Sequence, residues 1–137
     1  MVEYLLDASA LYPLMLKMRD KLFDYLNLLA VLDLTVYEIG NVIWKESRVG
    51  RVRAPKALAI AFEEVFRGVK VVRLRDEEIA DVLELALAEE ITFYDAAYLY
   101  AARKLRLRLV TEDSDLKKYP ESVGLEELVA GLERSRL

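Results

Sequence analysis

Four carboxylates, those of Asp7, Glu38, Asp95 and Asp113, stand at positions where they could act together. Asp7 and Asp113 follow short apolar runs that predict buried strands, whereas Glu38 and Asp95 lie in the first turns of predicted helices. Clustered carboxylates repel one another and take up protons unless a cation neutralises them. Oxygen ligands of this kind suit hard divalent cations such as Mg²⁺ and Mn²⁺, which also make water a usable nucleophile at neutral pH. The pattern therefore predicts a metal site with hydrolytic chemistry.

Helix capping is a simpler explanation for three of these acids. Asp7 precedes a predicted helix and is a good N-cap residue. Glu38 and Asp95 lie three residues after Thr35 and Thr92, which is the spacing of a capping box. The helix that follows Asp95 is apolar nearly all round, so we expect its start to be buried, and a buried ionised acid requires a partner. Both explanations stay open for each residue.

The fourth acid lies in the sequence TEDSD at 111–115. An acidic surface turn explains this segment without any chemistry. Alternatively, Asp113 is a carboxylate presented at the end of a strand, with Thr111 in support. Asp115 could share the role of Asp113 or replace it, so the fourth carboxylate is less well defined than the other three.

Two missing residue types narrow the chemistry. The chain of 137 residues contains no cysteine and no histidine, which excludes disulfides, thiol nucleophiles, zinc–thiolate sites and a Ser-His-Asp triad. Any hydrolysis must therefore use carboxylates, hydroxyls, Lys or Arg. The net charge of −4 is unlike that of a nucleic-acid-binding protein, but a site of four carboxylates would itself account for it.

Length and hydropathy bound the organisation and location of the chain. We expect residues 1–137 to form a single domain. No apolar stretch reaches the ~20 residues needed to span a bilayer, and the N-terminus lacks the basic region of a signal peptide. These features predict a cytoplasmic protein with no membrane partner. The chain has no glutamine and only two asparagines, a depletion that indicates a thermophilic source.

The periodicity of apolar residues predicts alternating strands and helices. Strands are expected at 2–6, 30–34, 69–74, 108–111 and 122–123. The first strand runs into a helix, and further helices are expected at 20–29, 35–48, 55–67, 76–89, 93–105 and 124–134. This alternation is typical of an α/β fold, here a parallel sheet of about five strands with helices on both faces. Sites in such sheets lie at the carboxyl ends of strands, where Asp7 and Asp113 are expected.

Two of the predicted helices have a well-defined apolar face. For the helix at 35–48, the residues expected on this face are Val36, Ile39, Ile43 and Trp44. For the helix at 76–89, the residues expected to face inward are Ile79, Val82, Leu83 and Ala86.

A polar stripe lies beside the first of these faces, formed by Glu38, Asn41, Lys45 and Arg48. An acid, an amide and two cations in line indicate a site that opens onto a polyanion track, although a solvated face explains Lys45 and Arg48 equally well. Basic residues at 45–53, 103–108 and 117–118 are further candidates for phosphate contacts, with a solvated surface as the alternative.

Four short motifs contain the acids: D-A-S at 7–9, Y-E-I-G-N at 37–41, Y-D-A-A-Y at 94–98 and L-V-T-E-D at 109–113. Together they resemble the PIN-domain family, and in particular VapC-type toxins of toxin–antitoxin pairs. All four occur in the family's order and spacing, and the resemblance covers essentially the whole chain. It implies a single PIN-like domain with a parallel sheet of about five strands.

The resemblance also implies an activity. The family's acidic quartet would be Asp7, Glu38, Asp95 and Asp113. This quartet would hold one or two Mg²⁺ or Mn²⁺ ions, and a metal-activated water would attack a phosphodiester of RNA. Ser9 and Thr111 match supporting hydroxyl positions, and Asn41 matches an amide that borders the site. A homodimer and an antitoxin that inserts a basic peptide near the acids would be the protein partners.

Three other functions stay compatible with these residues. The chain could be a non-catalytic PIN-like module that only binds RNA or protein, although all four acids are present. In a phospho-acceptor or phosphohydrolase Asp7 would be the nucleophile, but such sites normally need a second acid two residues later, where this chain has Ser9. In a purely structural α/β subunit, two capping boxes and a surface turn would explain the acids.

Overall fold

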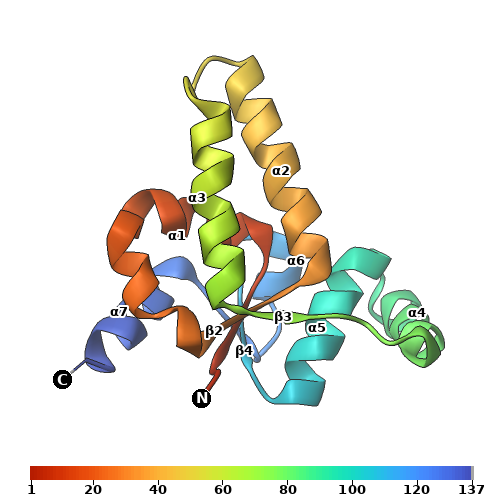
Figure 1. Cartoon of the computed structure of the whole chain (residues 1–137). Coiled ribbons are helices and arrows are strands. Elements are labelled where there is room, and N and C mark those ends of the chain that lie inside the picture. Colours follow the sequence, from red (N-terminus) through yellow and green to blue (C-terminus); the bar gives the residue numbers. More distant parts are fainter. Residues whose placement is uncertain (137) are drawn as a thin grey trace.

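The computed structural model describes residues 1–136 and contains a five-stranded sheet in which every pairing is parallel (Figure 1). The strands are β1 Tyr4–Leu6, β2 Leu29–Leu32, β3 Lys70–Val72, β4 Arg108–Val110 and β5 Ser122–Val123. They lie in the order β3-β2-β1-β4-β5, so β1 is central and pairs with β2 and β4. All five predicted strands are confirmed, with ends that differ by a few residues.

Helices cover both faces of this sheet. They are α1 Ala8–Met18, α2 Asp33–Arg48, α3 Pro55–Gly68, α4 Ile79–Glu89, α5 Phe93–Leu105, α6 Ser114–Lys117 and α7 Leu125–Arg134. Successive strand side chains point to opposite faces: Leu6 and Val110 pack with α1, α3 and α7, whereas Leu5 and Leu109 pack with α4 and α5. The predicted α/β fold with helices on both faces is therefore confirmed.

Helices α2 and α3 project beyond the sheet as an antiparallel pair, which with the connecting turn at 49–54 we call the arm (Figure 1). Ile39 and Ile43 of α2, which lie on the predicted apolar face, are buried. Val36 and Trp44, which were predicted on the same apolar face, are exposed, so only part of this face is buried. The reason is that α2 packs mainly against α3 and α1 and that the arm extends beyond the sheet (Figure 1), so part of its apolar face is exposed.

The apolar face of α4 is also narrower than predicted. Val82 and Ala86 are buried against α5, but Ile79 and Leu83 are exposed. Helix α4 is an outer helix that contacts mainly α5, so only residues one turn apart on a single line meet the core. The prediction of buried Ile79 and Leu83 is wrong for this reason.

The segment before β2 differs most from expectation. Instead of a helix at 20–29, two 3₁₀ segments, η1 Arg19–Asp24 and η2 Leu26–Leu28, lead directly into β2. Leu22, Tyr25 and Leu28 recur every three residues, a spacing that fits 3₁₀ turns as well as the face of an α-helix. A third 3₁₀ segment, η3 Asp76–Glu78, precedes α4, and the segment between β4 and β5 contains the short helix α6.

Candidate metal site

The candidate site lies at the carboxyl edge of the sheet, where the central strands end. Asp7 follows β1 and Thr111 follows β4, and these strands are paired so that Leu6 lies beside Val110. The backbone N–H of Asp7 donates to the carbonyl of Val110 at 3.2 Å, which continues the pairing up to the site. The two ends therefore present Asp7 and Thr111 to the same space, as the position of sites in parallel sheets predicts.

Asp7 is 6% exposed and its two carboxylate oxygens are held by different groups. Its Oδ1 accepts hydrogen bonds from the Ser9 hydroxyl at 2.6 Å and from the Ala10 backbone N–H at 3.1 Å. Its Oδ2 accepts from the Thr111 hydroxyl at 2.5 Å. The bond from Ala10 makes Asp7 the N-cap of α1, so the capping explanation holds together with a place in the cluster.

The environment of Asp7 disfavours its charged form. Burial raises the pKa of Asp7, although hydrogen bonds from Ser9, Thr111 and Ala10 oppose the shift, and the nearby carboxylate of Asp113 raises it further. Each of the three donors is neutral. A buried carboxylate whose partners are all neutral donors is stabilised by any cation that enters the site.

Glu38 is not part of a capping box. Helix α2 begins at Asp33, and its N-cap Leu32 makes no side-chain cap. Instead, the Tyr98 hydroxyl donates to Glu38 Oε1 at 2.5 Å, and the Thr35 hydroxyl lies 2.6 Å from the same tyrosine oxygen. Because the single hydroxyl proton of Tyr98 goes to Glu38, Thr35 must be the donor in the second bond. The buried pair of Thr35 and Tyr98 thus orients Glu38 toward the site.

The pKa of Glu38 is raised for the same main reason as that of Asp7. Its carboxyl group is half-buried, and burial raises its pKa. The hydrogen bond from Tyr98 opposes this shift, and the charges of Asp7 and Asp95 add to it. Glu38 therefore lies within electrostatic reach of two of the other predicted acids.

Asp95 lies in the first turn of α5, where the hydroxyl of the N-cap residue Thr92 accepts a hydrogen bond from the Asp95 backbone N–H at 3.0 Å. This is the half of the predicted capping box that uses the Thr92 side chain. Burial raises the pKa of Asp95, and the neighbouring carboxylates of Asp113, Asp115 and Asp7 raise it further. The second predicted cap is thus present, and its acid still belongs to the carboxylate cluster.

The acids of the segment at 112–115 separate into two groups. Asp95, Asp113 and Asp115 each offer a carboxylate oxygen within 4.8 Å of the others. Glu112 turns away: its carboxylate accepts from the Leu125 backbone N–H at 2.8 Å, and this bond lowers its pKa. Both Asp113 and Asp115 therefore stay candidates for the fourth position, and Glu112 does not.

Thr111 connects the two halves of the cluster. Its hydroxyl donates to Asp7 and accepts from the Asp113 backbone N–H at 3.0 Å. Ser9 does the same on the other side, since its hydroxyl donates to Asp7 and accepts from the Glu112 backbone N–H at 2.9 Å. The two hydroxyl oxygens lie 3.3 Å apart but have no proton left to share. They hold the loop after β4 against the start of α1.

Of the four predicted supporting residues, three lie at the acids and one, Asn41, makes no hydrogen bond with them that the structure records. Ser9 and Thr111 contact Asp7, and Asp115 lies with Asp95 and Asp113. Asn41 is exposed one turn beyond Glu38 on α2, and its side chain makes no hydrogen bond within residues 1–136. Its predicted place at the border of the site stays a prediction.

Two residues that contact the cluster were not predicted to do so, namely Thr35 and Tyr98. Tyr98 follows Asp95 by three residues and Thr35 precedes Glu38 by three, so each lies one helical turn from an acid. That spacing was visible in the sequence. The contact between the two helices, which makes the spacing meaningful, was not.

The donor set fits a hard divalent cation. It consists of carboxylates and hydroxyls, with no nitrogen or sulfur ligand, as Mg²⁺ and Mn²⁺ prefer. Burial, and after it the repulsion between the acids, raises the pKa values of Asp7, Glu38 and Asp95, and a bound cation would offset both effects. On both grounds the residues present fit a bound metal ion.

The fold and the acidic motifs agree with those of a known family. A family model described as PIN domain matches residues 4–122. The chain belongs to the PIN-domain family. Exonuclease VapC9 of Pyrobaculum aerophilum is 42% identical over 132 residues, which cover 96% of both chains. Ribonuclease VapC3 of the same organism is 39% identical over 98 residues, 69% of this chain and 74% of that one. The chain is therefore of the VapC type.

Solved structures agree with this assignment. The crystal structure of the protein PAE2754 from Pyrobaculum aerophilum matches with a TM-score of 0.84 and 42% identity, over 97% of this chain and 98% of the other. A toxin–antitoxin complex from Klebsiella pneumoniae matches with a TM-score of 0.63 over 88% of this chain and 96% of its own. At 18% identity the second match shows the fold alone. Among residues 1–136, no helix combines the length and apolar character needed to cross a membrane.

Proposed function

We propose that this PIN-domain protein is a metal-dependent endoribonuclease that hydrolyses RNA phosphodiesters. The observation that supports the proposal is the cluster of Asp95, Asp113 and Asp115, whose carboxylate oxygens lie within 4.8 Å of one another. Asp7 and Glu38 lie outside that set of distances, but their charges interact with its members and with each other, and burial and this repulsion raise the pKa values of Asp7, Glu38 and Asp95. The names of the relatives, an exonuclease and a ribonuclease, support nucleic acid as the substrate class.

The metal ligands in this proposal are Asp7, Glu38, Asp95 and Asp113, with Asp115 as the alternative to Asp113. A bound Mg²⁺ or Mn²⁺ ion supplies charge neutralisation at the phosphate and makes water a nucleophile at neutral pH. The protein's own groups do the positioning. Ser9 and Thr111 fix both oxygens of Asp7, and Tyr98 fixes one oxygen of Glu38, so that neither carboxylate can rotate away.

The proposal extends to partners and biological role. We infer that the chain is the toxin of a type II toxin–antitoxin pair, that it forms a homodimer, and that a cognate antitoxin places a basic peptide near the acids. A cationic side chain would neutralise the same carboxylates that a metal ion neutralises, which gives a physical route to inhibition. We further propose a cytoplasmic location and a thermophilic source.

The first test is cleavage of a mixed RNA pool in the presence of Mg²⁺, Mn²⁺ or EDTA. We expect cleavage with either metal and none with EDTA, and a loss of at least about 100-fold in Asp7→Asn and Asp95→Asn. The matched control is Glu112→Gln, because Glu112 is next to the proposed ligand Asp113 in sequence but its carboxylate binds the start of α7 instead. We expect that variant to cleave at the wild-type rate.

A circular RNA separates internal cleavage from cleavage at ends, because a circle has no end. Linear product from the circle supports the endoribonuclease, whereas cutting confined to linear RNA contradicts it. If folded protein free of any partner cleaves no RNA with any metal, the chain is instead a PIN-like module that binds RNA or protein.

A further inference from the structure

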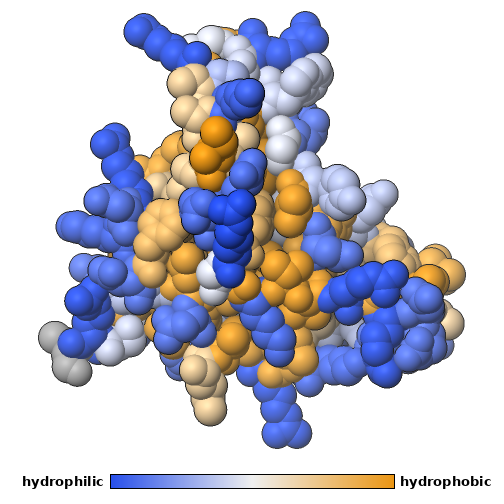
Figure 2. Space-filling view, in the orientation of Figure 1, coloured by the Kyte–Doolittle hydropathy of each residue, from blue (hydrophilic) through white to orange (hydrophobic). Residues whose placement is uncertain are grey.

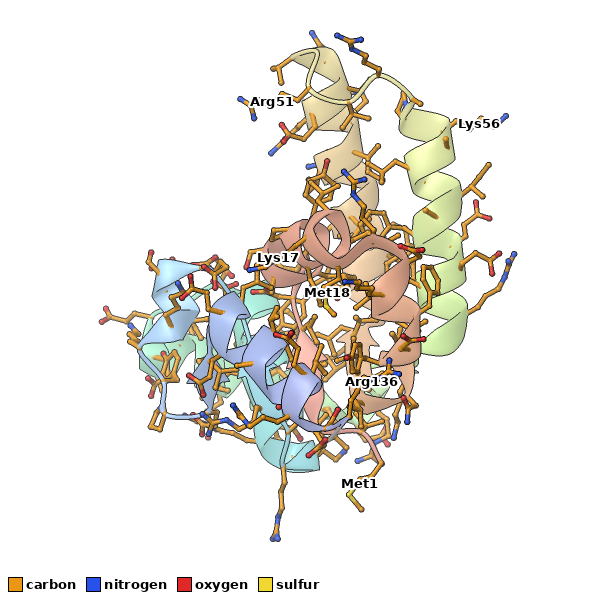
Figure 3. All side chains as sticks on the ribbon, turned by 90° about the vertical axis from the view of Figure 1, so that its left-hand side faces the viewer. Met1, Lys17, Met18, Arg51, Lys56 and Arg136 are labelled. Carbon is orange, nitrogen blue, oxygen red and sulfur yellow. The ribbon has the colours of Figure 1, made fainter. Side chains whose placement is uncertain are left out.

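The outer end of the arm, residues 44–56, concentrates positive charge, and we call this segment the arm tip. It holds five of the chain's 20 basic residues and one of its 24 acidic residues. Hydrophilic side chains cover this end of the molecule (Figure 2), and Arg51 and Lys56 extend from it away from the body (Figure 3). Because the net charge of the whole chain is −4, this local excess is opposite in sign to the average surface. Such asymmetry indicates an anionic ligand.

Most of these cations have no partner within the fold. Arg51 Nη1 lies 2.8 Å from Glu46 Oε2, the single acid of the arm tip. Within residues 1–136, no carboxylate lies at ion-pair distance from the other four cations, which are Lys45, Arg48, Arg53 and Lys56. Four positive charges at the end of the arm are thus available to an external anion.

An exposed aromatic ring lies among these charges. Trp44 is 55% exposed, and the guanidinium of Arg48 lies 5.1 Å from its ring centroid. This is a cation–π contact, which holds the two side chains together at the surface. Indole rings and guanidinium planes are the groups on which unpaired bases stack in complexes with single-stranded nucleic acid. An anion without aromatic rings would have no use for the exposed tryptophan, so the pair of Trp44 and Arg48 favours a ligand with bases.

The turn that carries the cations has a defined conformation. Gly50 has φ of 81°, a left-handed conformation that favours glycine. The backbone N–H groups of Arg51 and Val52 both donate to the Glu46 carbonyl, at 2.9 and 3.3 Å. The turn is therefore fixed before any ligand binds, which lowers the cost of ordering it in a complex.

Helix α2 connects the arm tip to the carboxylates. Glu38 lies near its start, and Asn41, Lys45 and Arg48 follow on the same polar stripe. Ten residues of α-helix separate Glu38 from Arg48, a distance of about 15 Å along the axis. A strand held at the carboxylates can therefore run along α2 and reach the arm tip if it is several nucleotides long.

We propose that the arm tip is a second RNA-binding site, which takes a single-stranded segment several nucleotides from the bond at the carboxylates. Arg48, Arg53 and Lys56 contact phosphates, and Trp44 stacks on a base. The inference deepens the proposed function, on which it rests for the choice of RNA as ligand. The arm tip would set which RNAs bind, namely those with an unpaired segment long enough to span both places.

The test measures RNA affinity in the full chain carrying Asp7→Asn, which keeps the RNA intact. Two ligands are compared, a single-stranded RNA of about 20 nucleotides and one of about two, which is too short to span the roughly 15 Å between Glu38 and Arg48. The arm-tip variants are Trp44→Ala and Arg53→Gln with Lys56→Gln. The control, Lys70→Gln with Arg108→Gln, removes the same charge from the starts of β3 and β4, at the opposite edge of the sheet.

We expect each arm-tip variant to weaken binding of the long RNA roughly tenfold and to leave the short RNA unchanged. In the double variant the slope of log affinity against log salt concentration should fall by about 1.4, for two lost phosphate contacts. The control should bind the long RNA within about twofold of the parent.

Equal losses in the arm-tip and control variants, or equal losses for long and short RNA, overturn the inference. Unchanged affinity in the arm-tip variants also overturns it and assigns the cations to an acidic protein partner. If wild-type protein cleaves RNA but the arm tip has no effect, only this inference fails. If the arm tip is needed for binding but no form cleaves RNA, only the proposed function fails.

Discussion

Two carboxylates are buried within residues 1–136, and their surroundings are opposite in kind. Asp7 is 6% exposed and Glu78 is 5% exposed. Asp7 is held by the hydroxyls of Ser9 and Thr111 and by one backbone N–H. Glu78 lies just beneath the surface under two cations: it accepts from Lys104 Nζ at 2.5 Å and from the backbone N–H of Arg75 at 2.9 Å.

The pKa values follow these partners. The hydrogen bond from Lys104, then that from Arg75, lowers the pKa of Glu78 to about 2. Burial raises the pKa of Asp7, because neutral donors do not compensate for the lost hydration. Glu78 thus has its counter-charge within the chain and serves the packing of η3 against α5. Asp7 lacks one, and the comparison identifies the Asp7 cluster as the place where an external cation is needed.

The largest expected effect is on stabilisation by metal. We expect Mn²⁺ at 100 times its Kd to stabilise the wild type by about 2.7 kcal/mol, which raises its Tm by roughly 8 °C. Asp7→Asn should lose this response, because a ligand is gone. Glu78→Gln should have a lower Tm in EDTA, since Lys104 loses its ionic partner, but should keep the full metal response. Thermal unfolding followed by circular dichroism measures both.

The same experiment can contradict the comparison. A metal response that survives in Asp7→Asn, or one that disappears in Glu78→Gln, would show that the ion binds elsewhere. Asp7→Asn should be about as stable as the wild type in EDTA. The substitution removes a buried charge and its repulsion from Asp113. The amide keeps one accepting oxygen, and its NH₂ group replaces the other, so one of the two hydroxyls must turn to accept instead of donate.

The sequence predicts the sheet and the acids better than the contacts between them. Strand positions follow from apolar runs such as residues 2–6, and these runs place Asp7 at the carboxyl edge. The capping box at Thr35 and Glu38 was a reasonable local prediction that the structure overturns, because Tyr98 of another helix binds both side chains. Local spacing cannot reveal a partner 60 residues away.

Surface and interior are harder to separate from pattern alone. Trp44 and Leu83 fall on periodic apolar faces, yet both are exposed because α2 extends beyond the sheet and α4 contacts mainly α5. Whether an apolar residue is buried depends on how far the neighbouring helix or strand extends, and the periodicity of one helix carries no information about its neighbours. The separation of Glu112 from Asp113 likewise depends on the start of α7.

A smaller effect is expected from the hydroxyl that orients Glu38. Tyr98→Phe removes the donor to Glu38 and the acceptor of Thr35. We expect Mn²⁺ affinity to fall roughly tenfold, as when other groups that orient metal ligands are removed, and stability to fall by about 1–3 kcal/mol. Isothermal titration calorimetry and denaturant unfolding give the two quantities.

The matched control for that substitution is Tyr119→Phe. Tyr119 is also buried, and its hydroxyl also donates to a glutamate, Glu89, at 3.0 Å, but this pair is not among the carboxylates of the cluster. If both variants lost Mn²⁺ affinity equally, the loss in Tyr98→Phe would come from disturbed packing and not from the hydrogen bond to Glu38.

The smallest effect is the pH dependence of stability without metal, which takes opposite signs at the two buried acids. The pKa values of Asp7, Glu38 and Asp95 are raised, so above pH ~4 the folded state binds more protons than the unfolded chain. Stability in EDTA should therefore fall as pH rises above the ordinary carboxyl range and through the raised folded-state values, which a series of Tm measurements against pH would follow. The lowered pKa of Glu78 contributes stability above pH ~4.5 that is lost as pH falls toward about 2.

Two substitutions divide this profile. Asp7→Asn should flatten the part above pH ~5, and Glu78→Gln should flatten the part below pH ~4. Added Mn²⁺ should reverse the slope in the upper range, because protons compete with the metal for the same carboxylates. A metal-free Tm that instead rises from pH 5 to 7 would mean that the Asp7 cluster already has its counter-charge within the fold, and the contrast with Glu78 would no longer point to an external cation.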